Sequence, residues 1–445
     1  MASPSRALPE SRPSAFDPAA ASGRAALPLR VGFTWSLFGW AGYAACQWLM
    51  LSVMAKLGSA EVIGQFAYAL AICAPLFMLT NLQLRGVQST DALSEYCFSD
   101  YLTLRLLGST AAVLLVVAVC PFLGLPRAAL CALLLVAAFK SLESFSDVIA
   151  GLMQKFEMLD SVAISLLLRG SIGIGAFGLC FALCRNLPLA LLLWIGAVAA
   201  VLARYDLRVA RRLARFEGGM AFRFNWRRLG TLVLTSLPLG LVSAIASLGA
   251  NIPRYAIRHA LSVAELGIFA SIAYPVTATT VVANSLGQSA LARLSRLFAD
   301  GRIGEFRQLV LKLVAFGAAI AFVALLLVSA GGNWLLSVLY TPEYARQGSL
   351  FQLLALTAGL NAIGCFLFYA LSAARQFKVQ LAISLASLLT TFVCSTLWVP
   401  RWRLIGAALA MLCAAADAIA AAGAILGLTI AQHKPRPLAA ALPIL

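Results

Sequence analysis

Charged residues are scarce in this chain. Of its 445 residues, 11% are charged and 62% are hydrophobic. A water-soluble domain could not place so much apolar side chain in its interior. The sequence therefore excludes an ordinary soluble protein and predicts an integral membrane protein, because apolar runs of about 20 residues, the length that crosses a bilayer, recur along it.

The chain also lacks the common signatures of catalysis. Its two histidines are His259 and His433, both near the ends of apolar runs, which leaves little for buried general-base chemistry. No P-loop, G-x-S-x-G or H-E-x-x-H segment is present, and no Cys or His spacing fits a metal site. Of the ten cysteines, seven fall in apolar runs, where cysteine behaves as a small hydrophobic residue. We therefore expect no enzyme, no cofactor and no metal.

The apolar runs predict an all-α polytopic membrane protein with about twelve transmembrane helices in two pseudo-symmetric six-helix bundles around a central cavity. The predicted spans are roughly 31–55, 62–84, 102–125, 128–152, 160–183, 187–205, 229–251, 265–289, 309–331, 349–373, 378–399 and 404–431. The predicted organisation is a proline-broken, disordered cytoplasmic tail over 1–30, an amino-terminal bundle over 31–205, a basic linker over 206–228, a carboxy-terminal bundle over 229–432 and a tail over 433–445.

The distribution of Lys and Arg predicts the orientation. With the N-terminus inside, most of the 34 basic residues fall on the cytoplasmic side, including the arginine-rich loop from Arg204 to Arg228. Both termini are therefore expected in the cytoplasm. Most of the net charge of +17 is explained by this topology, so we expect no nucleic-acid partner. The alternative for the arginine-rich loop is contact with anionic membrane lipids, but its role in orientation alone explains it.

The two halves resemble each other in sequence. The segment "AEVIGQFAYALAICAP" at 60–75 is echoed by "AELGIFASIAYP" at 264–275, and each opens the second helix of its half. Likewise "LTLRL" at 102–106 aligns with "LVLKL" at 309–313. Two parallel copies related by an axis along the membrane normal are a transporter architecture, with the substrate path between them.

A polar stripe crosses the fourth predicted span. In "KSLESFSDVIAGLMQK" at 140–155, the side chains of Lys140, Glu143, Asp147, Gly151 and Gln154 fall within an arc of about 80° on one helical face. A lysine near mid-membrane costs about 2.5–3.5 kcal/mol, so the stripe must face the protein interior or water. The first interpretation is a substrate-binding cavity, with Glu143 and Asp147 screening Lys140. The alternative is a self-satisfied ion pair that ties helices together.

Further polar residues extend this candidate site. The predicted substrate-binding residues are Arg85, Lys140, Arg169, Asn81, Gln83 and Arg254, and the predicted ion-coupling residues are Glu143, Asp147 and Asp417. The cationic members suit an anionic substrate, because guanidinium groups bind phosphate oxygens bidentately. For Arg85 alone, snorkelling to the headgroups is the competing explanation. Asp417, the only acidic residue of the last span, suits a coupling cation or a hydrogen bond to a neighbouring helix.

Several segments carry a family resemblance. "LTNLQLRGVQSTD", "FSDYLTLR", "KSLESFSDVIAGLMQKFEM" and "SLLLRG" resemble the polysaccharide-transport branch of the multidrug/oligosaccharidyl-lipid/polysaccharide exporter superfamily, which includes O-antigen and exopolysaccharide flippases. This resemblance is clearest over residues 40–170. In related flippases an arginine of the second helix lines the cavity, and Arg85 is the matching position.

The resemblance implies a function. It implies that a polyprenyl-pyrophosphate-linked oligosaccharide moves from the cytoplasmic to the periplasmic leaflet by alternating access. Net direction would come from an H+ or Na+ gradient or from removal of the product, and a polysaccharide polymerase and a chain-length regulator are the implied protein partners. Two other functions stay open: a cation-coupled multidrug antiporter of the same superfamily, and a membrane-embedded glycan polymerase or ligase.

Overall fold

The computed structural model describes residues 29–91 and 95–432 of the chain. These residues form helices joined by short connections, and no strand occurs among them. The tails predicted over 1–30 and 433–445 lie outside the described residues, apart from Leu29 and Arg30, which already belong to the first described helix.

The amino-terminal lobe contains the first half of the chain. Its elements are α2 (Leu29–Leu57), α3 (Ala60–Asn81), α4 (Leu84–Thr90), α5 (Phe98–Val119), η1 (Cys120–Leu123), α6 (Arg127–Lys155), α7 (Leu159–Cys184), α8 (Leu187–Val201), η2 (Leu202–Asp206), α9 (Leu207–Leu213) and η3 (Ala214–Phe216). The carboxy-terminal lobe consists of α10 (Trp226–Ala260), α11 (Val263–Ala299), α12 (Ile303–Leu339), α13 (Pro342–Ala345), α14 (Gly348–Ala373) and α15 (Phe377–Gln432).

The number of membrane crossings follows from helix length and bending. Among the described residues, ten helices are long and apolar enough to span, and α11, bent by 41° between Val276 and Thr279, gives an eleventh. The 56 residues of α15 would extend about 84 Å as one straight helix, more than twice the hydrocarbon thickness. Its backbone leaves the helical region at Arg403, so α15 contains two crossings. The predicted fold class, a helical membrane protein of about twelve spans in two lobes, is confirmed.

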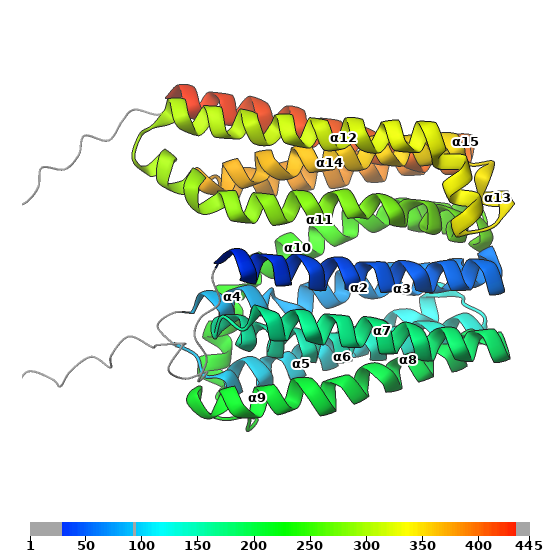
Figure 1. Cartoon of the computed structure of the whole chain (residues 1–445), viewed down its shortest axis with the longest axis horizontal. Coiled ribbons are helices and arrows are strands. Elements are labelled where there is room, and N and C mark those ends of the chain that lie inside the picture. Colours follow the sequence, from blue (N-terminus) through cyan, green and yellow to red (C-terminus); the bar gives the residue numbers. More distant parts are fainter. Residues whose placement is uncertain (1–28, 92–94, 433–445) are drawn as a thin grey trace, which may run out of the picture.

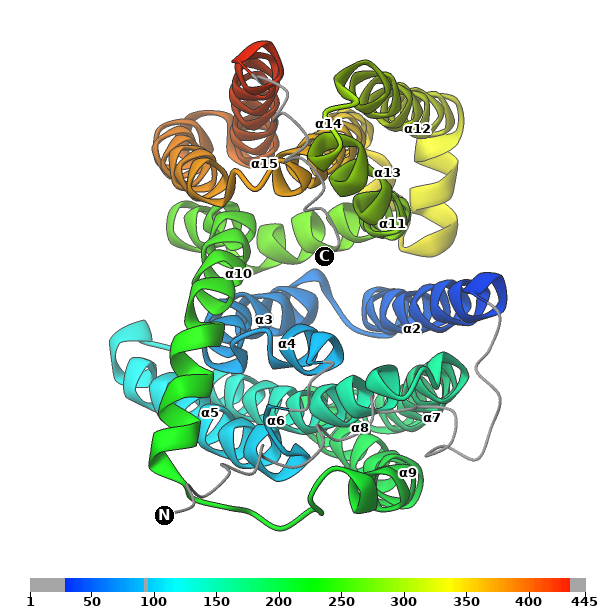
Figure 2. The ribbon, with the colours of Figure 1, turned by 90° about the vertical axis from the view of Figure 1, so that its left-hand side faces the viewer.

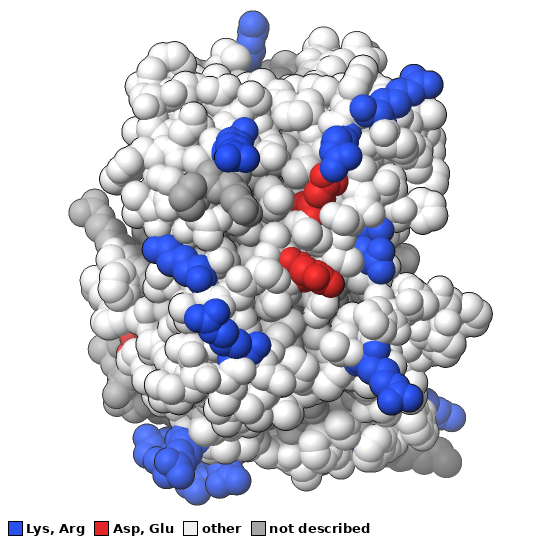
Figure 3. Space-filling model, turned by 90° about the vertical axis from the view of Figure 1, so that its right-hand side faces the viewer, with Lys and Arg blue, Asp and Glu red and all other residues white. Residues whose placement is uncertain are grey.

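The two lobes lie side by side with their helices nearly parallel (Figure 1). We call the end where α2 begins and α9 lies the arginine-rich end, and the other the opposite end. Figure 2 views the molecule from the arginine-rich end, with α2 and α3 between α10 and α11 of one lobe and α5–α8 of the other. Figure 3 shows the opposite end, where basic side chains are scattered around two acidic patches near the centre.

Matching residues of the two sequence repeats contact each other reciprocally across the interface between the lobes. A Cβ on Gly64 would lie 1.8 Å from the carbonyl oxygen of Val263, and a Cβ on Gly267 would lie 1.8 Å from that of Ala60. Gly64 matches Gly267 and Ala60 matches Val263 at one constant offset, as expected when the same surface of each repeat meets the other across a two-fold axis. Only glycine permits this backbone approach at the start of α3 and α11. Each helix is also capped alike, by the hydroxyls of Ser59 and Ser262.

The lobes also meet along an antiparallel seam between α3 and α10. At the arginine-rich end, the Cα of Leu82 lies close against Gly240. Further along, the Tyr255 hydroxyl donates a hydrogen bond to the Ala71 carbonyl, and the Arg258 guanidinium lies 5.7 Å from the Tyr68 ring centroid. By contrast, α11 bends away from α2 toward the arginine-rich end (Figure 1). The two lobes are therefore closed against each other most completely at the opposite end.

The segment predicted as a linker, 206–228, is attached to the amino-terminal lobe. It contains α9 and then an irregular stretch, in which Glu217 forms a buried ion pair with Lys155 at 2.8 Å. The backbone carbonyl of Glu217 also accepts a hydrogen bond from the Phe98 N–H, which begins α5. These contacts place the start of α10 beside α5 (Figure 2).

A branched side chain at Gly64 tests the reciprocal contact. We expect Gly64→Val to overlap the Val263 carbonyl and to lower stability by about 1–3 kcal/mol, the usual effect of overpacking. The measurement is the thermal unfolding midpoint of the purified protein in detergent, followed by tryptophan fluorescence. The matched control is Gly175→Val on α7, where a new Cβ meets nothing within 4 Å. Equal midpoints for the two variants would contradict the prediction.

Candidate substrate-binding site

Helix α6 keeps the predicted polar stripe partly exposed. The Lys140 Nζ lies 2.6 Å from Glu143 Oε2, and the side chains of the two residues are 25% and 28% exposed. The hydroxyl of Tyr43, on α2, donates to Glu143 Oε1 at 2.9 Å. The lysine charge is therefore compensated by a carboxylate one turn further along its own helix, and neither side chain of the pair is fully buried.

Arg169 lies behind this pair and is buried. Its guanidinium carbon is 6.0 Å from the Tyr43 ring centroid, a cation–π distance, and its Nε donates to the Ser165 carbonyl at 3.4 Å. It also interacts electrostatically with Glu143 and with Asp206, a buried carboxylate at the end of η2. Arg169 therefore supplies positive charge to the site from within α7, without an exposed guanidinium surface.

The other lobe contributes to the same place. Tyr274 of α11 lies within electrostatic reach of both Glu143 and Arg254. Arg254, on α10, donates to the Asn251 amide oxygen at 2.7 Å, one turn back along its own helix. Tyr274 thus relates Arg254, a predicted substrate-binding residue, to the surroundings of the α6 stripe. Both lobes therefore contribute side chains near Glu143.

A second cluster lies further along α6 toward the arginine-rich end. Asp147 forms ion pairs with two arginines, with Arg105 Nη2 at 3.1 Å and with Arg85 Nη1 at 3.5 Å. The Nε of Arg85 also donates to the Gln154 amide at 3.2 Å, and its guanidinium carbon lies 5.4 Å from the Trp40 ring centroid. Asp147 therefore pairs with arginines and does not screen Lys140 as the helical spacing suggested. Arg85 faces the site and does not extend to the headgroups.

A break in the chain positions Arg85. The helix predicted over 62–84 ends at Asn81, because Leu82 and Gln83 adopt left-handed backbone conformations with φ of 51°. Arg85 then begins the short helix α4, which packs on α6 where Gly151 leaves room: a Cβ there would lie 3.3 Å from the Arg85 Cα. The glycine in the polar stripe is thus the contact point for the element that carries Arg85.

The remaining predicted residues serve other contacts. Gln83 donates to the Ser243 hydroxyl at 2.8 Å, a bond between the lobes. The Asn81 backbone carbonyl accepts from Arg105 at 3.4 Å. Asp417 accepts from the Thr390 hydroxyl at 3.3 Å, between the two crossings of α15. For Asp417, this geometry matches the hydrogen bond to a neighbouring helix and places the carboxylate apart from the α6 stripe.

Sequence reasoning missed Arg105, Tyr43, Tyr274 and Asp206. Arg105 is the clearest case, since its side chain has no exposed surface, yet "LTLRL" was interpreted only as a match between the two halves. A charge inside an apolar run was the available signal, because such a charge needs a partner. The two tyrosines gave no such signal, since tyrosine is common in any membrane helix.

The arrangement can bind an anion. Five basic side chains (Arg85, Arg105, Lys140, Arg169 and Arg254) lie around three acidic ones (Glu143, Asp147 and Asp206). Arg105 and Arg169 are buried within the amino-terminal lobe. Glu143, the partner of Lys140, lies near Tyr274 of α11, so this pair is the part of the cluster that faces the other lobe. The Lys140 ammonium has three N–H donors and Arg85 has five, and their hydrogen bonds to Glu143, Gln154 and Asp147 use only part of them.

A comparison with known protein families shows which family the chain belongs to. The sequence profile of the family described as "Polysaccharide biosynthesis protein" matches residues 35–298. The chain belongs to this polysaccharide biosynthesis family. A curated relative, the capsular polysaccharide biosynthesis protein CapF of Staphylococcus aureus, is 30% identical over 366 residues, covering 82% of this chain and 91% of CapF. Both matches fit the polysaccharide-transport branch that the sequence motifs resembled.

Solved structures support the fold of this family member. A variant of the Vibrio cholerae MATE transporter VcmN aligns with a TM-score of 0.64 and 15% identity, covering 91% of this chain and 95% of VcmN. A MOP superfamily transporter from Pyrococcus furiosus, described as having a binding pocket of reverse polarity, aligns with a TM-score of 0.65 and 12% identity over 93% and 97% of the chains. At these identities the likeness shows the shared transporter fold.

Asp147→Asn tests the pairing of the buried Arg105. We expect a loss of about 3 kcal/mol in unfolding free energy, because a buried arginine would lose its carboxylate; this is the lower end of the usual range, since the Asp147 side chain is 34% exposed. The measurement is thermal or denaturant unfolding in detergent. The double variant Arg105→Met/Asp147→Asn should recover part of the loss. Additive losses would show that the pair is not coupled.

Proposed function

We propose that this family member is a flippase that moves a polyprenyl-pyrophosphate-linked oligosaccharide between membrane leaflets during polysaccharide biosynthesis. The observation that carries the proposal is Lys140, a partly exposed ammonium in the middle of α6, which belongs to a cluster with an excess of basic side chains and to the pair that faces the other lobe. A substrate with a phosphate head group would neutralise this excess of positive charge. The sugars would occupy the water-accessible space, and the lipid tail would stay in the bilayer.

The paired state of the cations suits reversible binding. Lys140 keeps donors to spare beside Glu143, and so does Arg85 beside Asp147, so pyrophosphate oxygens would add to the site without breaking either pair. When the substrate leaves, each cation is still compensated, which avoids the cost of a bare charge in the membrane. The ion pairs would therefore keep binding weak enough for turnover, as transport requires.

Sidedness and conformation follow from the same proposal. With the arginine-rich end in the cytoplasm of a bacterial cell and the protein in its inner membrane, both termini face the cytoplasm. The reciprocal contact at Gly64 and Gly267 then closes the periplasmic end, and the bend of α11 opens the cytoplasmic end. Alternating access would exchange these states by rocking the lobes about the α3–α10 seam.

Coupling belongs to the proposal as well. Protonation of Glu143 or Asp147, or an Na+ ion beside either, would change the charge felt by the bound phosphate. Asp417 lies apart from these residues and would act only through its own lobe. Where no ion is used, removal of the product by a polysaccharide polymerase and its chain-length regulator would give the net direction.

Lys140→Gln tests the binding role. The variant would lose one charged hydrogen bond to the phosphate, worth about 1.5–3 kcal/mol. We therefore expect transport of lipid-linked oligosaccharide into the periplasmic leaflet to fall roughly 10- to 100-fold. The measurement is the leaflet distribution of labelled lipid-linked oligosaccharide in inverted vesicles. The control is Arg302→Gln, which removes a cation from an exposed surface pair with Glu305.

Two outcomes would contradict the proposal. Transport by Lys140→Gln at the level of Arg302→Gln would remove Lys140 from the mechanism. Substrate that crosses normally in a strain lacking the protein but is not extended would indicate a polymerase or ligase, and hypersensitivity of that strain to organic cations alone would indicate a drug antiporter.

A further inference from the structure

A long apolar groove runs between α10 and the first crossing of α15. Its volume is about 650 Å³, and its lining is almost entirely apolar. The lining residues are Leu248, Ile252, Tyr255, Ala256, His259, Leu385, Leu388, Leu389, Phe392 and Thr396. Leu389 and Phe392 stay more than half exposed beside it. Since this surface lies at membrane depth, hydrocarbon chains and not water would fill the groove.

The groove is the length of one leaflet. From Leu248 to His259 the α10 axis rises about 17 Å, close to half of the roughly 30 Å hydrocarbon core. Its polar members, His259 and Thr396, lie toward the opposite end of the molecule, where α10 and the first crossing of α15 finish. A chain in the groove would therefore have its head group at the membrane surface of that end and its tail toward the bilayer centre.

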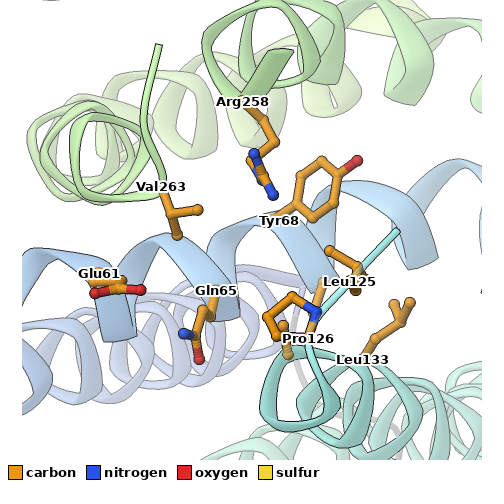
Figure 4. A pocket seen from close by; sticks show the side chains of 10 residues that line it. Glu61, Gln65, Tyr68, Leu125, Pro126, Leu133, Arg258 and Val263 are labelled. Atoms are coloured by element: carbon orange, nitrogen blue, oxygen red, sulfur yellow. The ribbon is translucent and has the colours of Figure 1, made fainter. Parts of the chain in front are cut away.

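A basic side chain lies at the head-group end. His259 lines the groove there, whereas the guanidinium of Arg258, the preceding residue, lies over the ring of Tyr68 in the inter-lobe pocket of Figure 4. The carboxylate in that pocket, Glu61, lies away from Arg258 in the same view. The last turn of α10 thus offers the His259 imidazole to a phosphate at the membrane surface.

We propose that this groove binds the single hydrocarbon chain of a polyprenyl phosphate lipid, with its phosphate at His259. The inference rests on the proposed function, since it places the lipid carrier of the substrate in the leaflet that the product enters. The groove offers one channel and one basic end. A carrier with one chain and one phosphate group matches this form better than a phosphoglyceride with two chains.

Packing and charge, and not the hydrophobic effect, must supply the selectivity. A chain that moves from bilayer to groove exchanges one hydrocarbon environment for another, so the gain comes from van der Waals contact and from the head group. Blocking the groove and removing the basic end should therefore each weaken binding. Tyr255 connects the groove to transport, because it lines the groove and also bonds α3 across the seam.

The test is photo-crosslinking of the full-length protein in phosphatidylcholine nanodiscs. One probe is a polyprenyl monophosphate with a diazirine in its chain; the other is phosphatidylglycerol with a diazirine in one acyl chain. Peptide mass spectrometry should find the polyprenyl probe on the segments 248–259 and 385–396. Leu389→Trp, which fills the groove, should lower this labelling about fivefold or more through lost packing. His259→Ala should lower it as well, because the phosphate loses a donor.

The matched control is Leu327→Trp on α12, where the leucine is 66% exposed, against 62% for Leu389. Neither change removes a buried side chain, and thermal unfolding will verify that both variants fold. Equal labelling of the two variants, or labelling by phosphatidylglycerol as strong as by the polyprenyl probe, overturns the proposal. Labelling needs no glycan and no transport. If Lys140→Gln transports normally, the proposed lipid site in the groove is therefore unaffected. If the groove is not labelled, the proposed role of Lys140 in transport is likewise unaffected.

Discussion

The structure depends on the cost of leaving a charge unpaired in hydrocarbon. Every ionisable side chain of the α6 stripe has a partner at hydrogen-bonding or ion-pair distance: Lys140 has Glu143, and Asp147 has two arginines. These partners come from different helices, so satisfying the charges also fixes how α2, α4 and α5 pack on α6. The same groups that suit substrate binding therefore hold the amino-terminal lobe together, and stability and binding cannot be separated fully at these positions.

The joint between the lobes follows from a different constraint, the size of the side chain where two backbones touch. Gly64 and Gly267 allow α3 and α11 to meet backbone to backbone, and the repeat makes the contact symmetric. Beside it, α3 and α10 touch along most of their length through small residues and a few polar bonds. A contact concentrated at one end and a seam along one line form the joint between the lobes. Such a joint suits the proposed rocking of the lobes about that seam.

The groove between α10 and α15 is a distinct feature of the membrane-facing surface. An exposed leucine in a bilayer has no consequence by itself, but a hollow between two helices that is one leaflet long and ends at a histidine is a feature that flat lipid-facing helices lack. The proposed charge-binding residues around Lys140 and the proposed hydrocarbon groove would divide the recognition of an amphiphilic substrate into two regions. The two regions lie on either side of α10, the helix that touches both lobes.

The sequence by itself determined the membrane class, the approximate place of each span but not its ends, the division into two related halves and the polar face of α6, because hydropathy and helical periodicity are local properties. It also marked Arg85, Lys140 and Arg169 as unusual, since a charge in an apolar run stands out. Only the tertiary structure decided which carboxylate pairs with which cation, that Arg105 belongs to the site, and that Arg254 and Tyr274 reach it from the other lobe. Those choices depend on backbone breaks such as that at Leu82 and on contacts between helices far apart in the chain, which no local pattern encodes.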